Sequence, residues 1–134
     1  MSQWVTDTHA LLWHLYDANK LSPQARNIFT GTDAGEHQIV IPAIVVVEII
    51  YLSEKGRIAR DAVEQVIQLL QADSDNYLIA PLDLGIATAL QHIGRDAVSD
   101  MPDRVIAATA LHLELPLLTR DTRIIKVGAI STVW

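Results

Sequence analysis

Two aspartates at the start of a small, apolar segment have the types and the spacing to do chemistry. The segment reads SDMPDRVIAATAL, and Asp100 and Asp103 stand on either side of Pro102. A helix start can use one Asp as its N-cap and a second acid in its first turn, because both interact favourably with the backbone N–H groups there. Capping explains Asp100 well and Asp103 only in part. If further acids converge on the same place, a metal site becomes the better interpretation.

Three other carboxylates are candidates for that convergence. Asp7 follows the run WVT, Asp121 follows LLTR, and Glu48 lies within the apolar stretch IPAIVVVEIIYL. Asp7 could instead cap the next helix, and Asp121 could lie in a simple turn. A carboxylate in surroundings as apolar as those of Glu48 must be paired with a cation such as Arg, hydrogen-bonded, protonated or bound to a metal ion.

Alternating strands and helices are predicted to position these acids. Short β-branched or apolar runs at 3–6, 38–41, 76–80, 115–119 and 130–134 predict strands, and helical spacing predicts helices over 9–17, 43–54, 59–72, 83–94 and 103–113. The alternation predicts a parallel sheet with helices on both faces. In such sheets ligands bind beyond the carboxyl ends of the strands, where Asp7 and Asp121 are expected. The second turn of a helix that begins near Pro42 would carry Glu48 to the same edge.

Composition and charge narrow the class of protein. The chain has 134 residues, half of them apolar, which predicts one domain over residues 1–134. It has no cysteine, so a thiolate metal site and a cysteine nucleophile are excluded. The net charge of −6 argues against nucleic-acid binding through a broadly basic surface. The N-terminal stretch does not resemble a signal peptide and no apolar run approaches the roughly 20 residues of a membrane span, so we expect a cytoplasmic protein without a membrane partner.

If the carboxylates converge, they predict a hard metal ion. Asp7, Glu48, Asp103 and Asp121 would repel one another strongly at one edge of the sheet without a cation. Oxygen ligands alone favour Mg²⁺ or Mn²⁺ over zinc. The basic residues Arg120, Arg123 and Lys126 lie next to Asp121 in the sequence, where they could meet a nucleic-acid backbone.

The same segments carry a resemblance to a known family. VTDTHALLWHL, the Glu in IPAIVVVEI, DMPDRVIAATAL and LLTRD resemble the four acidic motifs of the PIN-domain ribonucleases, and the opening and DMPDR are most similar to toxins of VapBC-type toxin–antitoxin pairs. The resemblance implies a metal site formed by Asp7, Glu48, Asp103 and Asp121, with Asp100 a less central acid. It also implies a parallel sheet in the order 3-2-1-4-5, Mg²⁺-dependent hydrolysis of RNA, a cognate antitoxin and a homodimer.

Two other classes of function stay open at this point. Haloacid-dehalogenase-like phosphotransferases also carry an Asp after their first strand, but they have a second acid two residues later, where this chain has His9. A PIN-like protein can also lack catalysis and act only by binding a partner. The presence of all four acids argues against that second alternative, and metal-dependent cleavage would decide it.

Overall fold

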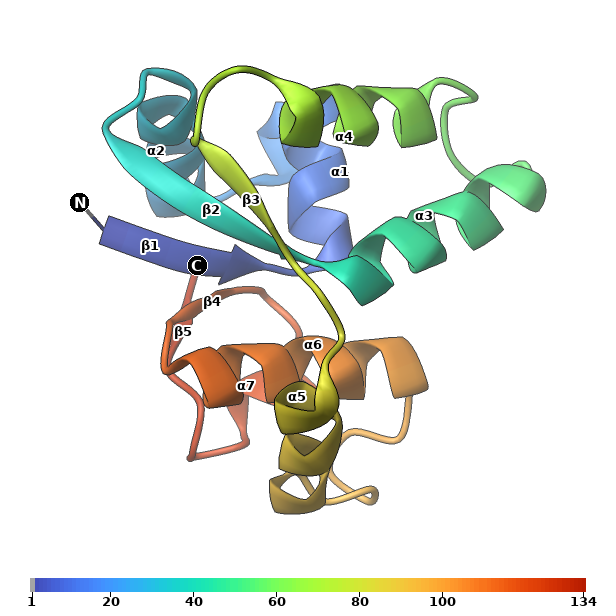
Figure 1. Cartoon of the computed structure of the whole chain (residues 1–134), viewed down its shortest axis with the longest axis vertical. Helices are drawn as coiled ribbons and strands as arrows, with labels where there is room; N and C mark the ends of the chain where they lie inside the picture. Colours follow the sequence, from blue (N-terminus) through green and yellow to red (C-terminus); the bar gives the residue numbers. More distant parts are fainter. Residues whose placement is uncertain (1) are drawn as a thin grey trace.

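Five parallel strands form one sheet in the order β3-β2-β1-β4-β5, which confirms the expected topology (Figure 1). The strands are β1 (Ser2–Thr6), β2 (His37–Pro42), β3 (Tyr77–Ala80), β4 (Leu117–Leu118) and β5 (Thr132–Val133). These positions come from a computed structural model that describes residues 2–134, so Met1 of the expected domain 1–134 lies outside the described residues. The strand order reverses between β1 and β4, the two strands that precede Asp7 and Asp121.

Helices follow the strands in the predicted alternation. They are α1 (Thr8–Tyr16), α2 (Pro23–Asp33), α3 (Ala43–Glu54), α4 (Ala62–Gln71), α5 (Leu84–Ala89), α6 (Met101–Leu113) and α7 (Thr122–Ile125), with short 3₁₀ helices at Ala18–Lys20 and Leu90–His92. Helices α1 to α4 lie in the upper half of Figure 1, and α5 to α7 lie in the lower half. Within residues 2–134, no helix is long and apolar enough to cross a bilayer.

Helix α2 was missed by the sequence analysis. Its start signal is present, because the Ser22 side chain accepts a hydrogen bond from the Ala25 N–H and Pro23 occupies the first turn. Ala25, Ile28 and Phe29 are buried at helical spacing. The sequence Thr-Gly-Thr at residues 30–32 obscures this pattern, since these residues have low helix propensity.

The helix α6 owes its close approach to the sheet to small side chains. Ala107, Ala108 and Ala110 are buried, and the neighbouring Ile106 is fully inaccessible to solvent. Alanine favours the helix and adds little bulk, so α6 contacts both β1 and α3. The start of α6, which carries Asp103, is thereby held at the carboxyl edge of the sheet.

A polar network ties α1, α2 and β3 together away from this edge. The Tyr77 hydroxyl donates a hydrogen bond of 2.5 Å to one Asp33 carboxylate oxygen, and His14 Nε2 lies 3.0 Å from the other. The His14 ring also stacks on Phe29, with the ring centroids 4.5 Å apart. Burial and the Asp33 carboxylate raise the pKa of Tyr77 well above its usual range, so this tyrosine stays protonated and acts as a donor.

We expect Tyr77→Phe to lower the free energy of unfolding by about 1–2 kcal/mol, because it removes one hydrogen bond to a charged group. Urea unfolding measures the change. Tyr51→Phe is the matched control, since Tyr51 is 60% exposed, and it should change stability by less than about 0.5 kcal/mol. Equal stability of Tyr77→Phe and the control would show that the Asp33 contact adds nothing.

Candidate functional site

Three of the four predicted acids line one open pocket at the carboxyl edge of the sheet. The pocket has a volume of about 430 Å³ and is lined by Asp7, His9, Trp13, Asp103, Arg120, Asp121, Thr122 and Arg123. Its acids come from the ends of β1 and β4 and from the first turn of α6. The convergence of Asp7, Asp103 and Asp121 therefore follows from the parallel topology and the packing of α6.

Asp7 both caps a helix and faces the pocket. Its Oδ1 accepts a hydrogen bond of 2.8 Å from the Ala10 N–H at the start of α1. Only 8% of the residue is exposed. Burial raises the pKa of Asp7 above its ordinary value, although the Thr119 hydroxyl and the Ala10 N–H act in the opposite direction. Asp7 thus caps α1, as one interpretation of the sequence predicts, and it also lies in the pocket where the other interpretation expects a metal site.

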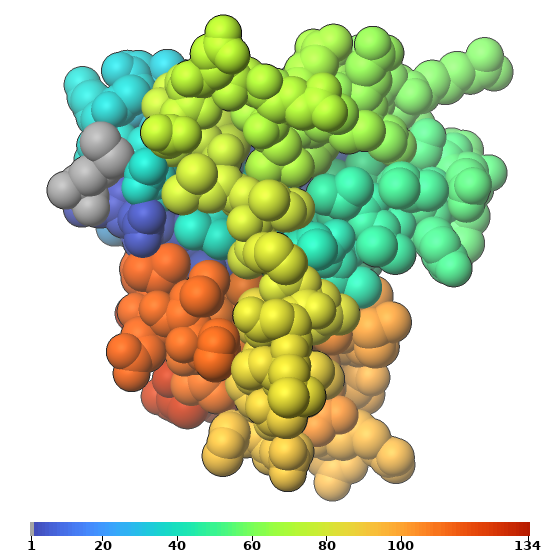
Figure 2. All heavy atoms as spheres, in the orientation of Figure 1, coloured from blue at the N-terminus to red at the C-terminus, as the bar shows by residue number. Residues whose placement is uncertain are grey.

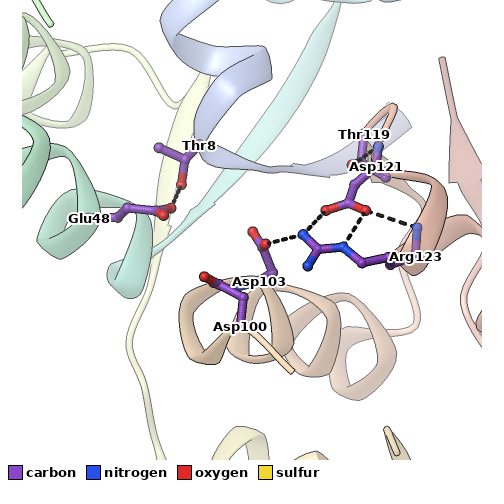
Figure 3. Close-up of polar contacts among 7 residues, drawn as sticks. All are labelled: Thr8, Glu48, Asp100, Asp103, Thr119, Asp121 and Arg123. Atoms are coloured by element: carbon purple, nitrogen blue, oxygen red, sulfur yellow. Dashed lines mark hydrogen bonds and ion pairs between the residues drawn. The ribbon is translucent and has the colours of Figure 1, made fainter. Parts of the chain in front are cut away.

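Asp100 and Asp103 take different roles at the start of α6. Asp100 is the N-cap, and its Oδ1 accepts from the Asp103 N–H at 3.2 Å. The Asp103 side chain instead points toward Asp121 and Arg123 (Figure 3). Burial raises the pKa of Asp103 to about 7, and the nearby carboxylates of Asp100, Glu48 and Asp121 add to the shift. Asp103 is therefore held among like charges, which makes its ionised form unfavourable. A role in helix capping alone does not explain this arrangement.

Arg123 provides a positive charge between Asp103 and Asp121. Its Nη2 lies 3.2 Å from Oδ2 of Asp103 and 3.0 Å from Oδ2 of Asp121, and its Nε lies 3.3 Å from Oδ1 of Asp121 (Figure 3). Burial acts to raise the pKa of Asp121, but the hydrogen bonds and charge of Arg123 outweigh it and lower the pKa. The predicted basic patch is thus divided, because Arg123 is paired with the acids while Arg120 is not part of these ion pairs.

Glu48 lies apart from the pocket and is held by a threonine. Its carboxylate accepts a hydrogen bond from the Thr8 hydroxyl, and Figure 3 shows it across a gap from Asp103. Glu48 is half-buried, and the hydrogen bond from Thr8 offsets part of the cost of burying its carboxylate. Among the described residues, the arginine ion pair considered from the sequence is not formed. Its charge nevertheless contributes to the raised pKa of Asp103.

Two threonines that the sequence analysis did not select support the acids. Thr8 binds Glu48, and the Thr119 hydroxyl accepts a hydrogen bond of 3.0 Å from the Asp121 N–H. Each stands within two positions of a predicted acid, directly after Asp7 or two residues before Asp121. Their position beside Asp7 and Asp121 was the available signal, although Thr8 contacts Glu48 on another helix and Thr119 contacts the backbone N–H of Asp121.

The donor chemistry of the pocket suits a hard cation. Asp7, Asp103 and Asp121 offer carboxylate oxygens, and the Arg123 guanidinium already occupies a cation position between two of them. As the side chains stand, residues 2–134 contain no three acidic or histidine groups close enough to surround one ion. A bound ion would therefore require side-chain rotation, with Arg123 moving away from Asp103 or Asp121.

Together, the fold and the pocket define an α/β protein with an acidic site at the point where the order of its parallel strands reverses. The family model of the PIN domain matches residues 4–130, so the chain belongs to the PIN domain family. The haloacid-dehalogenase-like alternative is not supported.

Solved structures show the same fold over nearly the whole chain. VapBC2 from Rickettsia felis, bound to a DNA fragment from its promoter, is 12% identical with a TM-score of 0.71, and the match covers 98% of this chain and 97% of that chain. A toxin–antitoxin complex from Klebsiella pneumoniae is 21% identical with a TM-score of 0.66, covering 98% and 96%. VapBC-1 from nontypeable Haemophilus influenzae is 15% identical with a TM-score of 0.67, covering 98% and 96%. No curated protein matches the chain.

The raised pKa of Asp103 predicts how stability depends on pH. A carboxyl whose folded pKa is about 7 instead of the ordinary 3.8 binds its proton more tightly in the folded state. The contribution of this carboxyl to the free energy of unfolding is therefore complete below pH 3.8, and it is lost as the pH rises through 7. In EDTA at pH 8, Asp103→Asn should therefore leave the protein as stable or more stable, by up to about 1–2 kcal/mol, because it removes a repelled charge.

Urea unfolding of both proteins between pH 4 and pH 8 measures this difference. The advantage of Asp103→Asn should shrink as the pH falls, since the wild-type carboxyl then becomes neutral. A variant that loses about 0.3–1 kcal/mol at every pH would mean that Asp103 acts mainly as a favourable helix-start charge.

Proposed function

We propose that this protein is a Mg²⁺-dependent endoribonuclease that acts in the cytoplasm as the toxin of a type II toxin–antitoxin pair. The observation that carries the proposal is the convergence of the Asp7, Asp103 and Asp121 carboxylates in one pocket of a PIN domain, where Arg123 pairs with Asp103 and Asp121. Three carboxylates and one internal cation form an arrangement suited to exchanging that cation for a metal ion.

In this mechanism Asp7, Asp103 and Asp121 would hold the ion, and Glu48 would complete the acidic site from across the gap. When bound, Mg²⁺ supplies Lewis-acid chemistry at the scissile phosphate and lowers the pKa of a water molecule that attacks it; Mn²⁺ could substitute. Thr8 orients Glu48, and the backbone N–H of Ala10 fixes the rotamer of Asp7. A protein nucleophile is not needed, because the attacking group is water.

Arg123 then acts in two places. While it pairs with Asp103 and Asp121 it offsets their repulsion. If those carboxylates held an ion instead, the Arg123 guanidinium would be released to contact an RNA phosphate. It therefore competes with the ion for the same carboxylates. It would also link ion binding to RNA binding.

The surface next to the pocket supports an antitoxin partner. A groove of about 390 Å³ between α1 and the end of α3 shares His9 and Trp13 with the acidic pocket, and Leu12, Leu52 and Ile58 add apolar lining. An apolar antitoxin helix fits this chemistry, with one of its basic side chains reaching the acids. The Klebsiella pneumoniae protein of the same fold was solved as a toxin–antitoxin complex, which also supports the assignment.

A second copy of the chain fits the apolar face formed by α3, α4 and the edge strand β3. A groove of about 360 Å³ there is lined by Ala43, Val46, Val47, Ile67, Leu70, Gln71 and Ile79. Figure 2 shows the segment from β3 to α5 crossing the neighbouring surface, where Leu82 is 49% exposed and Leu84 is 79% exposed. An exposed apolar surface of this kind, continued by a sheet edge, favours self-association, and we propose a homodimer.

Cleavage of RNA should require Mg²⁺ or Mn²⁺ and should stop in EDTA. Asp7→Asn and Asp103→Asn should each reduce the cleavage rate about a hundredfold or more, because each removes charge at the position of the ion. The matched control is Asp96→Asn, since Asp96 is an exposed acid outside the pocket. Cleavage that continues unchanged in EDTA would contradict the metal mechanism, and a folded protein inactive with every metal would favour the binding-module alternative.

Competition for the acids predicts the effect of Arg123→Gln. Without the guanidinium, Asp103 and Asp121 lose the partner that competes with the ion, so at pH 8 Mn²⁺ should bind about threefold tighter or more. Titration calorimetry in the absence of RNA measures the affinity. Arg95→Gln removes an exposed positive charge outside the pocket and is the control for net charge. Unchanged Mn²⁺ affinity in Arg123→Gln would show that the ion and Arg123 do not share a position.

Expression of the protein alone should arrest bacterial growth, and co-expression of its antitoxin should restore it. Asp103→Asn, expressed to the same level, should allow growth without the antitoxin. Normal growth with a wild-type protein that cleaves RNA in vitro would count against the toxin role and leave the nuclease assignment intact.

A further inference from the structure

The acidic pocket has an aromatic and basic wall in addition to its carboxylates. Trp13, His9 and Arg120 belong to the same lining as Asp7 and Asp103. The pocket volume of about 430 Å³ lies within the range of sites that enclose small organic ligands. The pocket therefore has room for part of a nucleotide beside the acids.

Arg120 is stacked on Trp13. Its Cζ atom lies 4.3 Å from the centroid of the indole ring, which is a close cation–π contact. Trp134 meets the same indole at an interplanar angle of 67° with centroids 5.8 Å apart, and His9 lies 5.7 Å from it. Because these neighbours fix the Trp13 ring, the planar guanidinium of Arg120 rests on a rigid support.

The charge of the pocket disfavours RNA binding unless another interaction adds affinity. The chain carries a net charge of −6, and the pocket acids repel RNA phosphates. Stacking on a nucleobase adds affinity that does not depend on phosphate charge. Aromatic rings and guanidinium planes are the groups on which proteins stack unpaired RNA bases.

We infer that Trp13 and Arg120 form a stacking subsite for one unpaired nucleobase of single-stranded RNA, next to the acidic pocket. The inference rests on the proposed ribonuclease function and specifies its substrate as RNA with an unstacked base beside the cleaved phosphate. A base inside a duplex could not reach the guanidinium plane, so double-stranded RNA is disfavoured.

Binding of short, fluorescently labelled RNA oligonucleotides tests the subsite. Measurements are made in EDTA, so that affinity is separated from cleavage, and each oligonucleotide is compared with versions that lack one base at successive positions. The wild-type protein should bind the complete strand about tenfold tighter than the version lacking the stacked base. Arg120→Lys should remove most of this preference, since lysine keeps the charge and loses the plane.

Salt dependence separates stacking from charge. Arg120→Lys should retain the wild-type slope of log affinity against log salt concentration, whereas Arg120→Gln should reduce that slope by about 0.7. Arg60→Lys, at an exposed position outside the pocket, should change neither the base preference nor the slope. Trp13→Leu keeps apolar volume in the partly buried site, and it should also lose the base preference.

Equal binding of complete and base-deleted strands by the wild-type protein, or no binding of either, would overturn the inference. A base preference that survives in both Arg120→Lys and Trp13→Leu would overturn it as well. Since this assay needs no cleavage, a base preference in a protein that does not cleave RNA would reject the nuclease function alone. Metal-dependent cleavage without a base preference would reject the subsite alone.

Discussion

Mutual repulsion among carboxylates at one edge of the sheet is the constraint on which the site depends. Asp7, Asp103 and Asp121 line the same pocket, and the pKa of Asp103 is raised to about 7 by burial and by its acidic neighbours. Folding tolerates this concentration of charge because Arg123 pairs with two of the acids. The helix-start N–H groups of α1 and α7 offset part of the remaining charge by donating to Asp7 and Asp121.

The sheet produces this convergence through its order. Strands β1 and β4 are parallel neighbours, so the residues that follow them lie side by side at the carboxyl edge of the sheet. Helix α6 then brings Asp103 to the same place, because its alanine-rich side packs closely against β1 and α3. A single substitution at any of these three acids therefore alters a site that the whole domain assembles.

The sequence was sufficient to predict the parts of the site that the backbone determines. Asp7 and Asp121 follow apolar runs, and parallel strands bring their carboxyl ends to one edge, so their proximity could be predicted. Contacts between long or rotatable side chains could not be predicted in this way. The pairing of Arg123 with Asp103 joins residues twenty positions apart, and the Thr8–Glu48 hydrogen bond joins residues forty positions apart. Both depend on rotamers that only the assembled fold selects.

Helix α2 was missed for a different reason, because weak helix formers in its last turns hide a start signal that was present.

The role of the acids as a metal centre is tested most directly by diffraction from crystals grown with Mn²⁺, with data collected at the manganese absorption edge. We expect an anomalous peak in the acidic pocket, within direct coordination distance of the Asp103 and Asp121 carboxylates, and an Arg123 side chain that has moved away from at least one of them. An empty pocket with Arg123 still bound to both acids, at a Mn²⁺ concentration that supports RNA cleavage, would contradict it.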